Sequence, residues 1–249
     1  MGRGAAGASL LLAAVLTVLG LVGCAPARTV TVLAAASLTE AFDELAATYQ
    51  QEHPGIAVRV SYGSSATLAA QVTAGARADV FASANEATMA SLTEAGLPVE
   101  PSVLTTNRLQ IAVPPGNPGR VEGLADFARE DLRIALCAKE VPCGSAARTL
   151  LDEAGVEASV DTYEVDVKAT LRKVELGEVD AALVYRTDVT SAGDRVRGLS
   201  TEGADRVGNT YLVTTLPDPP AGDRAAEFVA HVLSPAGHQV LARYGFGDG

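Results

Sequence analysis

Short apolar runs alternate with amphipathic segments along almost the whole chain. The apolar runs are rich in β-branched residues, which predicts strands at 30–35, 56–62, 79–83, 109–114, 133–137, 181–185 and 210–216. The segments between them repeat apolar residues at helical spacing, which predicts helices at 38–52, 66–75, 86–95, 144–154, 167–177, 222–233 and 236–244. Strands that alternate with helices indicate an α/β fold built on mainly parallel sheet.

Glycines occur at the ends of several predicted helices. Gly75, Gly96, Gly155 and Gly177 stand at or just after the ends of predicted helices, where a residue that tolerates left-handed backbone angles is favoured. The stretch PPGNPG at 114–119 is typical of a surface turn.

The first residues of the chain follow a different pattern. An apolar run follows Arg3 and ends in Leu21-Val22-Gly23-Cys24. It is shorter than the roughly 20 residues that cross a bilayer, so it predicts a lipoprotein signal peptide over residues 1–23. Cleavage before Cys24 would leave a lipid on that cysteine and a linker at 24–28. We therefore expect an exported protein anchored to the extracytoplasmic face of the membrane; the alternative is an ordinary signal peptide with an incidental cysteine.

The cysteine count agrees with export. Three cysteines would leave one thiol unpaired outside the cytoplasm. Lipidation of Cys24 would leave two cysteines, which can pair with each other. Cys137 and Cys143 then remain, in the stretch CAKEVPC, and a disulfide between them would contribute about 2 kcal/mol in the chain-entropy model. A metal site is the rival interpretation, but the three histidines lie far away in the sequence.

Charge and composition exclude several functions. The formal net charge is −11, and removal of residues 1–23 takes away Arg3 and no acid, which makes it −12. Nucleic acid and anionic membrane surfaces are therefore not expected partners, and contact with the membrane is expected only through the lipid. About 225 mature residues suffice for one large domain or two of ordinary size, and the apolar fraction of 48% suffices for their cores. The lack of tryptophan argues against a sugar-stacking platform.

Small and hydroxyl-bearing residues gather where strands pass into helices. These junctions are AAASLTE at 34–40, GSSATL at 63–68, VPCGSAA at 141–147 and VDVKATL at 165–171. The free N–H groups and dipole of a helix N-terminus favour an anion, and in open α/β sheets ligands bind beside the carboxyl ends of the strands. The pattern predicts an anion site made of neutral donors.

Each of these residues also has a purely structural interpretation. Ser37 with Glu40 could form a capping box, Ser65 could cap the following helix, and Asp166 could cap the helix that begins at Val167. Tyr185 ends a buried strand and could be a core tyrosine with a satisfied hydroxyl.

Five separated blocks resemble the periplasmic or lipid-anchored molybdate-binding proteins of ABC transporters. The blocks are TVLAAASLTEAFDELA (31–46), SYGSSATLAAQVTAGARADVFASAN (61–85), VPCGSAARTLL (141–151), VDVKATLRKVELGEVDAALVYRTDV (165–189) and ARYGF (242–246). The resemblance implies a two-lobed type II periplasmic-binding-protein fold with a ligand cleft between the lobes. It places lobe 1 at 29–106, completed by 214–249, and lobe 2 at 107–213, with crossings near 105–109 and 210–214.

The resemblance also implies the binding residues. A tetrahedral oxyanion would be held by the hydroxyl and N–H groups of Ser37 and Ser65, by the N–H groups of Cys143 and Val167, and by the phenol of Tyr185. These residues would contact the oxygens of molybdate or tungstate and would not ligate the metal directly. Relatives commonly carry alanine at the position of Cys143, which leaves a backbone donor unaffected.

A pocket of donors without acceptors disfavours a protonated ligand, because the ligand's own hydroxyl would lack a partner. The implied protein is a monomer without a cofactor that delivers its anion to an ABC permease. Three alternatives stand beside it: a binding protein for another oxyanion such as sulfate, a hydrolase with Ser64, Ser65 or Cys143 as nucleophile, and a structural surface lipoprotein. The hydrolase is disfavoured because GSSAT lacks the second glycine of a nucleophile elbow.

Overall fold

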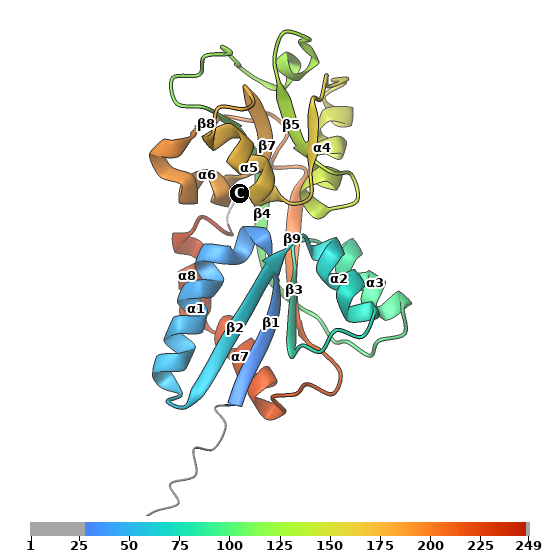
Figure 1. Ribbon diagram of the computed structural model, residues 1–249, viewed down its shortest axis with the longest axis vertical. Helices are drawn as coiled ribbons and strands as arrows, with labels where there is room; N and C mark the ends of the chain where they lie inside the picture. Colours follow the sequence, from blue (N-terminus) through green and yellow to red (C-terminus); the bar gives the residue numbers. More distant parts are fainter. Residues whose placement is uncertain (1–27, 248–249) are drawn as a thin grey trace, which may run out of the picture.

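The computed structural model describes residues 28–247 (Figure 1). Nine strands form one sheet in the order β2-β1-β3-β9-β4-β7-β5-β6, with β8 paired to β4. The predicted signal peptide and the lipidated Cys24 lie outside the described residues. None of the helices within 28–247 is long and apolar enough to cross a bilayer.

The sheet is divided between two lobes, which lie one above the other in Figure 1. The first lobe contains β1 (Arg28–Ala35), β2 (Ile56–Gly63), β3 (Val80–Ser83), α1 (Thr39–Glu52), α2 (Ser65–Thr73), α3 (Glu86–Glu94), α7 (Asp223–Val232) and α8 (Pro235–Arg243). The second contains β5 (Ile134–Cys137), β6 (Thr162–Glu164), β7 (Ala181–Tyr185), β8 (Arg197–Leu199), α4 (Pro142–Glu153), α5 (Val167–Glu175) and α6 (Arg186–Ala192). Two long strands, β4 (Ser102–Val113) and β9 (Gly208–Thr215), run between them.

The crossing strands make the sheet mixed. In the first lobe β1 pairs parallel with β2 and β3, and in the second β5 pairs parallel with β6 and β7. β4 runs antiparallel to β9 over Ser102 to Arg108 and then antiparallel to β7 from Leu109 onward. One strand therefore belongs to both lobes, so a small twist within it changes the angle between them.

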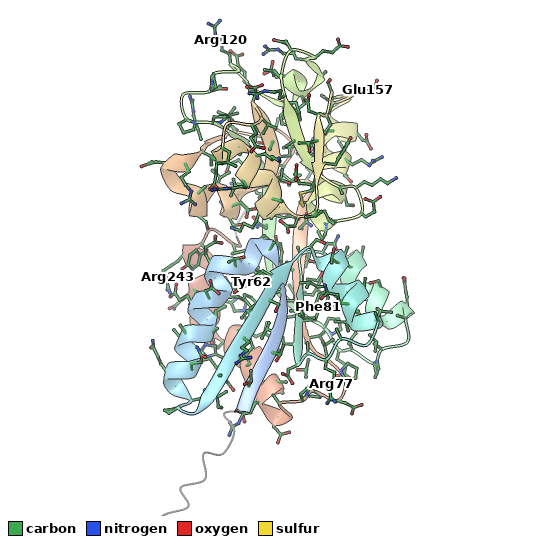
Figure 2. All side chains as sticks on the ribbon, in the orientation of Figure 1. Tyr62, Arg77, Phe81, Arg120, Glu157 and Arg243 are labelled. Carbon is green, nitrogen blue, oxygen red and sulfur yellow. A yellow bond between two sulfur atoms is a disulfide. The ribbon has the colours of Figure 1, made fainter. Side chains whose placement is uncertain are left out.

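Strand alternation explains how the first lobe buries both faces of its sheet. Val80 and Ala82 of β3 face a cluster with Phe42 and Phe228, whereas Phe81 faces a second cluster with Leu92. Figure 2 shows Phe81 within this lobe and Arg243 on its outer surface. Because Phe228, Val232 and Leu241 belong to the cluster of α1, the C-terminal helices pack on the N-terminal part of the chain. The second lobe has one continuous core around β4, β5 and β7.

All seven predicted strands and all seven predicted helices are present, with shifted ends. The pattern missed β6 and β8, which are three residues each and carry polar side chains, and α6, whose sequence RTDVTSA has no apolar stripe. It also placed the start of β4 too late, because Thr105, Thr106 and Asn107 interrupt the apolar run. The four glycines expected at helix ends have φ between 66° and 94°, which confirms the left-handed termination.

Candidate functional site

The four strand-to-helix junctions meet at one small cavity between the lobes. Residues of the first lobe and of the second both line it; they are Ala35, Ala36, Ser37, Gly63, Ser64, Ser65 and Ala84 from the first, and Pro142, Cys143, Asp166, Val167 and Tyr185 from the second. The cavity is small, with a volume of about 20 Å³. Of the residues that the structure describes, no lysine, arginine or histidine lines it.

Two adjacent serines at the start of α2 have different tasks. Ser64 is the N-cap, with its Oγ accepting from the Thr67 N–H at 3.1 Å and donating to Thr67 Oγ1 at 2.8 Å. The cap interpretation of Ser65 is therefore wrong. Ser65 is 1% exposed, and its Oγ accepts from the Ala84 N–H at 2.9 Å. Because a backbone N–H can only donate, the hydroxyl proton of Ser65 stays free to donate.

Ser37 does not form the capping box either. It lies in the 3₁₀ turn Ala36–Leu38, and α1 begins after Leu38 with no side-chain cap. Its Oγ is 2.8 Å from Tyr211 Oη, while Glu40 turns away to pair with Lys168. The capping-box interpretation of Ser37 is therefore wrong, and Ser37 lies buried against the cavity with its hydroxyl beside Tyr211.

Cys143 and Val167 bring backbone donors from the second lobe. Each lies in the first turn of its helix, where N–H groups have no acceptor within the helix. Asp166 caps α5 through a bond from the Ala169 N–H at 2.9 Å, as predicted, so its carboxylate is held by the helix that it precedes. Gly144 lets α4 start this close to β5, since a Cβ there would lie 1.9 Å from the Ala138 carbonyl oxygen.

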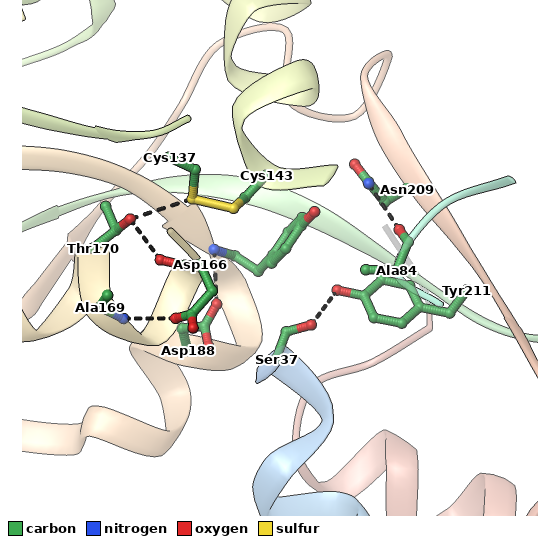
Figure 3. Close-up of a disulfide and its surroundings, with 11 residues drawn as sticks. Ser37, Ala84, Cys137, Cys143, Asp166, Ala169, Thr170, Asp188, Asn209 and Tyr211 are labelled. Carbon is green, nitrogen blue, oxygen red and sulfur yellow. Dashed lines mark hydrogen bonds between the residues drawn. A yellow bond between two sulfur atoms is a disulfide. The ribbon is translucent and has the colours of Figure 1, made fainter. Parts of the chain in front are cut away.

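A disulfide joins Cys137 at the end of β5 to Cys143, with 5.8 Å between the Cα atoms (Figure 3). Cys137 Sγ also lies 3.3 Å from Thr170 Oγ1 on α5. The bridge therefore ties together the strand and the two helix starts that form the second-lobe wall of the cavity.

Tyr185 differs from an ordinary core tyrosine. Its side chain is fully buried, yet its hydroxyl has no hydrogen-bond partner among the described residues. Burial raises the pKa of this phenol well above its ordinary value, so the group keeps its proton at physiological pH. A buried donor without a partner at the wall of a cavity points to a ligand that accepts from it.

The strands that cross between the lobes contribute polar residues that the sequence pattern did not single out. Tyr211 of β9 contacts Ser37, and Asn209 donates to the Ala84 carbonyl at 2.8 Å (Figure 3). Asn107 of β4 donates to Tyr211 Oη at 3.3 Å. The apolar residues of β4 and β9 were enough to predict strands there, so the polar residues received no attention. Polar side chains within otherwise buried strands were the signal that could have identified them.

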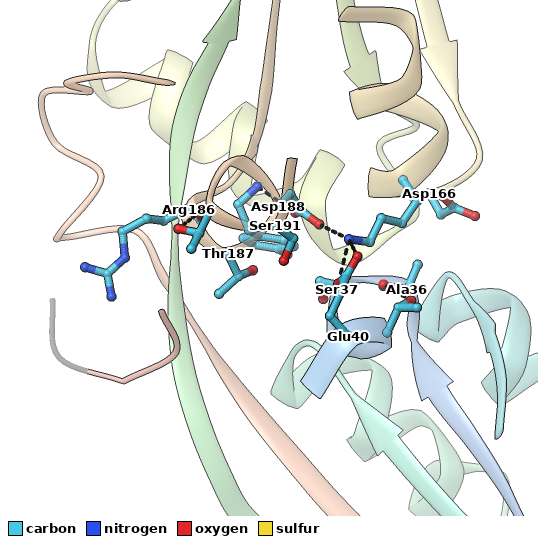
Figure 4. A network of polar contacts seen from close by, with 12 residues as sticks. Ala36, Ser37, Glu40, Asp166, Arg186, Thr187, Asp188 and Ser191 are labelled. Atoms are coloured by element: carbon cyan, nitrogen blue, oxygen red, sulfur yellow. Dashed lines mark hydrogen bonds and ion pairs between the residues drawn. The ribbon is translucent and has the colours of Figure 1, made fainter. Parts of the chain in front are cut away.

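One ion-pair cluster bridges the lobes beside the cavity (Figure 4). Lys168 Nζ lies 2.8 Å from Glu40 Oε1 across the cleft and 3.2 Å from Asp188 Oδ1 within its own lobe. Burial would lower the pKa of Lys168, but the two carboxylates raise it above its ordinary value. Since both carboxylates offset its charge, Lys168 is not a free counter-ion for an anion.

Within residues 28–247 we find no cluster of metal ligands and no free thiol at the cavity. The described residues contain no group of three or more His, Cys, Asp or Glu side chains that could hold a metal ion. Cys143 is in a disulfide, and His231 is occupied by Thr48 and Glu52. The cavity is suited to binding a small anion by neutral donors.

Comparisons with known proteins agree with this architecture. The family model described as bacterial extracellular solute-binding protein matches residues 30–247. The chain is 38% identical over 221 residues to the molybdate-binding protein ModA of Mycobacterium bovis, covering 88% of this chain and 85% of that protein.

Solved structures show the same fold. The periplasmic molybdate-binding protein of Azotobacter vinelandii superposes with a TM-score of 0.75 at 20% identity, over 88% of this chain and 99% of that one. The sulfate-binding protein SubI of Mycobacterium tuberculosis does so with a TM-score of 0.75 at 17% identity, over 88% and 86%. With its matching family model, its close relative and its two-lobed α/β fold, the chain belongs to the family of bacterial extracellular solute-binding proteins.

Proposed function

We propose that the protein captures molybdate, with tungstate as a second ligand, and delivers it to an ABC permease. The observation that carries this proposal is the buried, unpartnered hydroxyl of Tyr185 at a cavity that Ser37, Ser65, Cys143 and Val167 also line. The identity to a molybdate-binding protein supports the choice of anion.

The proposed contacts are the hydroxyls of Ser37, Ser65 and Tyr185 and the N–H groups of Ser37, Ser65, Cys143 and Val167. A dianion taken out of water needs many hydrogen bonds, and bonds to a charged acceptor are individually strong. Neutral donors therefore suffice without a lysine or arginine in the cavity.

The proposed cycle uses both lobes. The anion first meets Ser37 and Ser65 in lobe 1, at 29–106 and 214–249, and lobe 2, at 107–213, then closes over it with Cys143, Val167 and Tyr185. A ligand shifts such an equilibrium only by binding the closed form more tightly, so a permease that recognises the closed surface responds to loaded protein. A monomer held by lipid on Cys24 would keep this cycle at the extracytoplasmic face.

Calorimetric titration of the purified protein tests the proposal. Molybdate and tungstate should bind with one-to-one stoichiometry, and sulfate and phosphate should bind more weakly. Tight sulfate binding without molybdate binding would instead make the protein a sulfate-binding protein, as SubI of the same fold is named. Binding of none of the four anions would refute an oxyanion site.

A further inference from the structure

We infer that the segment 244–247 connects the two lobes through Arg186 and positions Tyr185 for the anion. The inference rests on the proposed oxyanion function and adds Arg186 to it as a positioning residue, which lies outside the lining of the cavity. The segment includes the end of the block ARYGF at 242–246, which the anion site leaves unexplained.

The end of α8 turns the chain back into the first lobe. The Gly245 N–H donates to the Ala242 carbonyl at 2.9 Å, and the Phe246 N–H donates to the Leu241 carbonyl at 3.1 Å. These two bonds form a Schellman motif, for which Gly245 takes a left-handed φ of 89°. Phe246 is thereby placed in the core of the first lobe, where it is 4% exposed.

The same segment is bound to the second lobe. Arg186, the first residue of α6, donates through Nη2 to the Gly245 carbonyl and to the Gly247 carbonyl, the latter at 3.1 Å. The Gly247 N–H donates to the Thr106 carbonyl of β4 at 2.9 Å. Figure 4 shows the Arg186 side chain pointing away from Ser37. The Schellman motif is complete without these three bonds, which therefore serve the connection between the lobes.

Arg186 directly follows the proposed anion contact Tyr185. Tyr185 is the last residue of β7 and pairs with Leu109 of β4, and its N–H donates to Asp188 Oδ2 at 3.1 Å. From Arg186 onward the chain is outside the sheet. The bonds of Arg186 to the first lobe therefore restrain the backbone next to the residue whose side chain lines the cavity.

A row of three aromatic rings links the same segment to the Tyr185 side chain. Tyr185 lies edge-on to Tyr211 of β9 with 6.0 Å between the ring centroids, and Tyr211 lies edge-on to Phe246 with 5.4 Å. All three side chains are buried. Because edge-to-face pairs have a preferred geometry, Phe246 in the first lobe restrains the ring of Tyr185 in the second through one ring on a crossing strand.

These restraints matter because of the state of the Tyr185 hydroxyl. It has no hydrogen-bond partner among the described residues, so its direction depends on the backbone and the ring of Tyr185. The segment 244–247 restrains both. A hydrogen bond weakens steeply away from its preferred distance and angle, so a phenol that is held less firmly gives a weaker bond to the anion.

Arg186→Gln tests the restraint on the backbone. Glutamine is shorter than arginine, so the Gly245 and Gly247 carbonyls lose their shared donor. Molybdate affinity, measured by titration calorimetry, should fall about three- to tenfold. An unchanged affinity would overturn the inference.

Arg108→Gln is the matched control for the loss of charge. A second pocket of about 300 Å³ is lined by Arg108, Arg186 and Gly247, and the Arg108 guanidinium pairs there with Asp205. The substitution removes the same charge from the same pocket and leaves the bonds of Arg186 in place, so affinity should stay within about twofold of wild type. Equal losses in Arg108→Gln and Arg186→Gln would overturn the inference, because charge alone would then explain both.

A double variant shows whether the effect passes through the Tyr185 hydroxyl. In a Tyr185→Phe background the donor is already absent, so Arg186→Gln should lower affinity by less than about twofold. A residue that only supported the fold or the net charge would have the same effect in both backgrounds, and that result would contradict a positioning role.

Phe246→Leu decides the question if Arg186→Gln does not fold. Leucine keeps the site apolar but removes the ring at the end of the aromatic row. Molybdate affinity should fall about two- to fivefold, and in a Tyr185→Phe background the same substitution should leave it unchanged. No loss in the single variant, or equal losses in both backgrounds, would refute the inference.

The wild-type protein separates this inference from the proposed function. Absence of oxyanion binding to wild type would refute the function itself. Molybdate binding that does not depend on Arg186 would leave the function in place and refute only the role that we assign to the segment 244–247.

Discussion

The three hydroxyl groups that we propose as contacts of the anion are held in three different ways. Ser65 accepts from a backbone N–H, Ser37 contacts the phenol of Tyr211, and Tyr185 has no partner among the described residues. An unsatisfied buried hydroxyl costs about 1–3 kcal/mol, so the protein without ligand carries a penalty at Tyr185 that a bound anion would relieve. Stability and affinity should therefore respond in opposite directions at this residue.

Tyr185→Phe should weaken molybdate binding about ten- to a hundredfold, because a donor to a dianion is lost. The same change should raise the free energy of unfolding of the ligand-free protein by about 1 kcal/mol, since it removes the unpartnered hydroxyl. Titration calorimetry and urea denaturation measure the two effects.

Tyr49→Phe is the control for this prediction. Tyr49 is also buried, but its hydroxyl reaches Glu227 at 3.4 Å, far from the cavity in the core of α1 and α7. Its loss should leave affinity unchanged and should not stabilise the protein. A Tyr185→Phe variant that binds like wild type would remove the phenol from the site.

Substitutions at Ser64 and Ser65 can separate helix capping from ligand binding. Ser64→Ala should lower the free energy of unfolding by about 1 kcal/mol through loss of the N-cap of α2, with molybdate affinity changed by less than about threefold. Ser65→Ala should weaken binding by about tenfold or more. Denaturation measures the stability of both variants, and calorimetry measures their affinity for molybdate. Weak binding by Ser64→Ala with normal binding by Ser65→Ala would contradict the assignment.

Asp188 should make stability depend on pH. Burial raises its pKa to about 6, although Lys168 and the Tyr185 N–H act to lower it. Because the folded-state pKa is raised, Asp188 contributes most to stability at low pH, and the contribution is lost as pH rises through about 6. Relative to Asp188→Asn, wild type should lose about 1–3 kcal/mol of stability between pH 4 and pH 7. Parallel denaturation curves for the two proteins over that range would contradict this.

At the scale of elements, the site depends on where helices start. α2, α4 and α5 each begin directly at the cavity, and three of the proposed contacts lie in their first turns: Ser65, Cys143 and Val167. The disulfide adds a covalent link between the end of β5 and the start of α4. The position of the Cys143 N–H is thus fixed both by helix α4 and by the disulfide to β5.

Replacement of both cysteines, Cys137→Ala with Cys143→Ala, should lower the free energy of unfolding by about 2 kcal/mol, because the short loop is no longer closed. Affinity should fall by less than about tenfold, since the donor at residue 143 is the backbone. Reduced and oxidised wild type should differ in the same direction in thermal denaturation. Complete loss of binding in the double variant would show that the sulfur atoms themselves are needed.

At the scale of the whole molecule, polar contacts join the two lobes: Lys168 pairs with Glu40, and Arg186 donates to the Gly245 and Gly247 carbonyls. Of the ion pairs found within residues 28–247, Lys168 with Glu40 is the one that joins the two lobes. Both side chains are partly exposed, at 26% and 37%, so the pair is weakened by water and salt. Its position favours the closed arrangement without locking it.

Glu40→Gln should weaken molybdate binding about two- to fivefold at low salt, and the difference from wild type should shrink as salt is added. Titrations at two ionic strengths measure this effect. Glu44→Gln serves as the control, because Glu44 on the same helix pairs with Arg243 inside the first lobe. Equal effects of the two substitutions would mean that the cross-lobe position has no special influence.

Much of this protein follows from the sequence alone. The apolar periodicity located the strands and helices of the main alternation, because a run such as AALVY has to be buried wherever it lies. The small residues at the strand-to-helix junctions, read with the family resemblance, identified five residues that the fold does bring to one cavity. Local chemistry sufficed for these features, since a helix start and a buried strand are encoded within a few residues.

Only the tertiary structure decided how these pieces act on one another. The bond between Ser65 Oγ and the Ala84 N–H joins residues 19 positions apart in the chain. The contacts of Tyr211 with Ser37 and Asn107 depend on the two crossing strands, and the pairing of Lys168 with Glu40 depends on how the lobes meet. Hydrogen-bond direction and ion pairing require atoms within about 3 Å, and long-range folding alone determines which residues come that close.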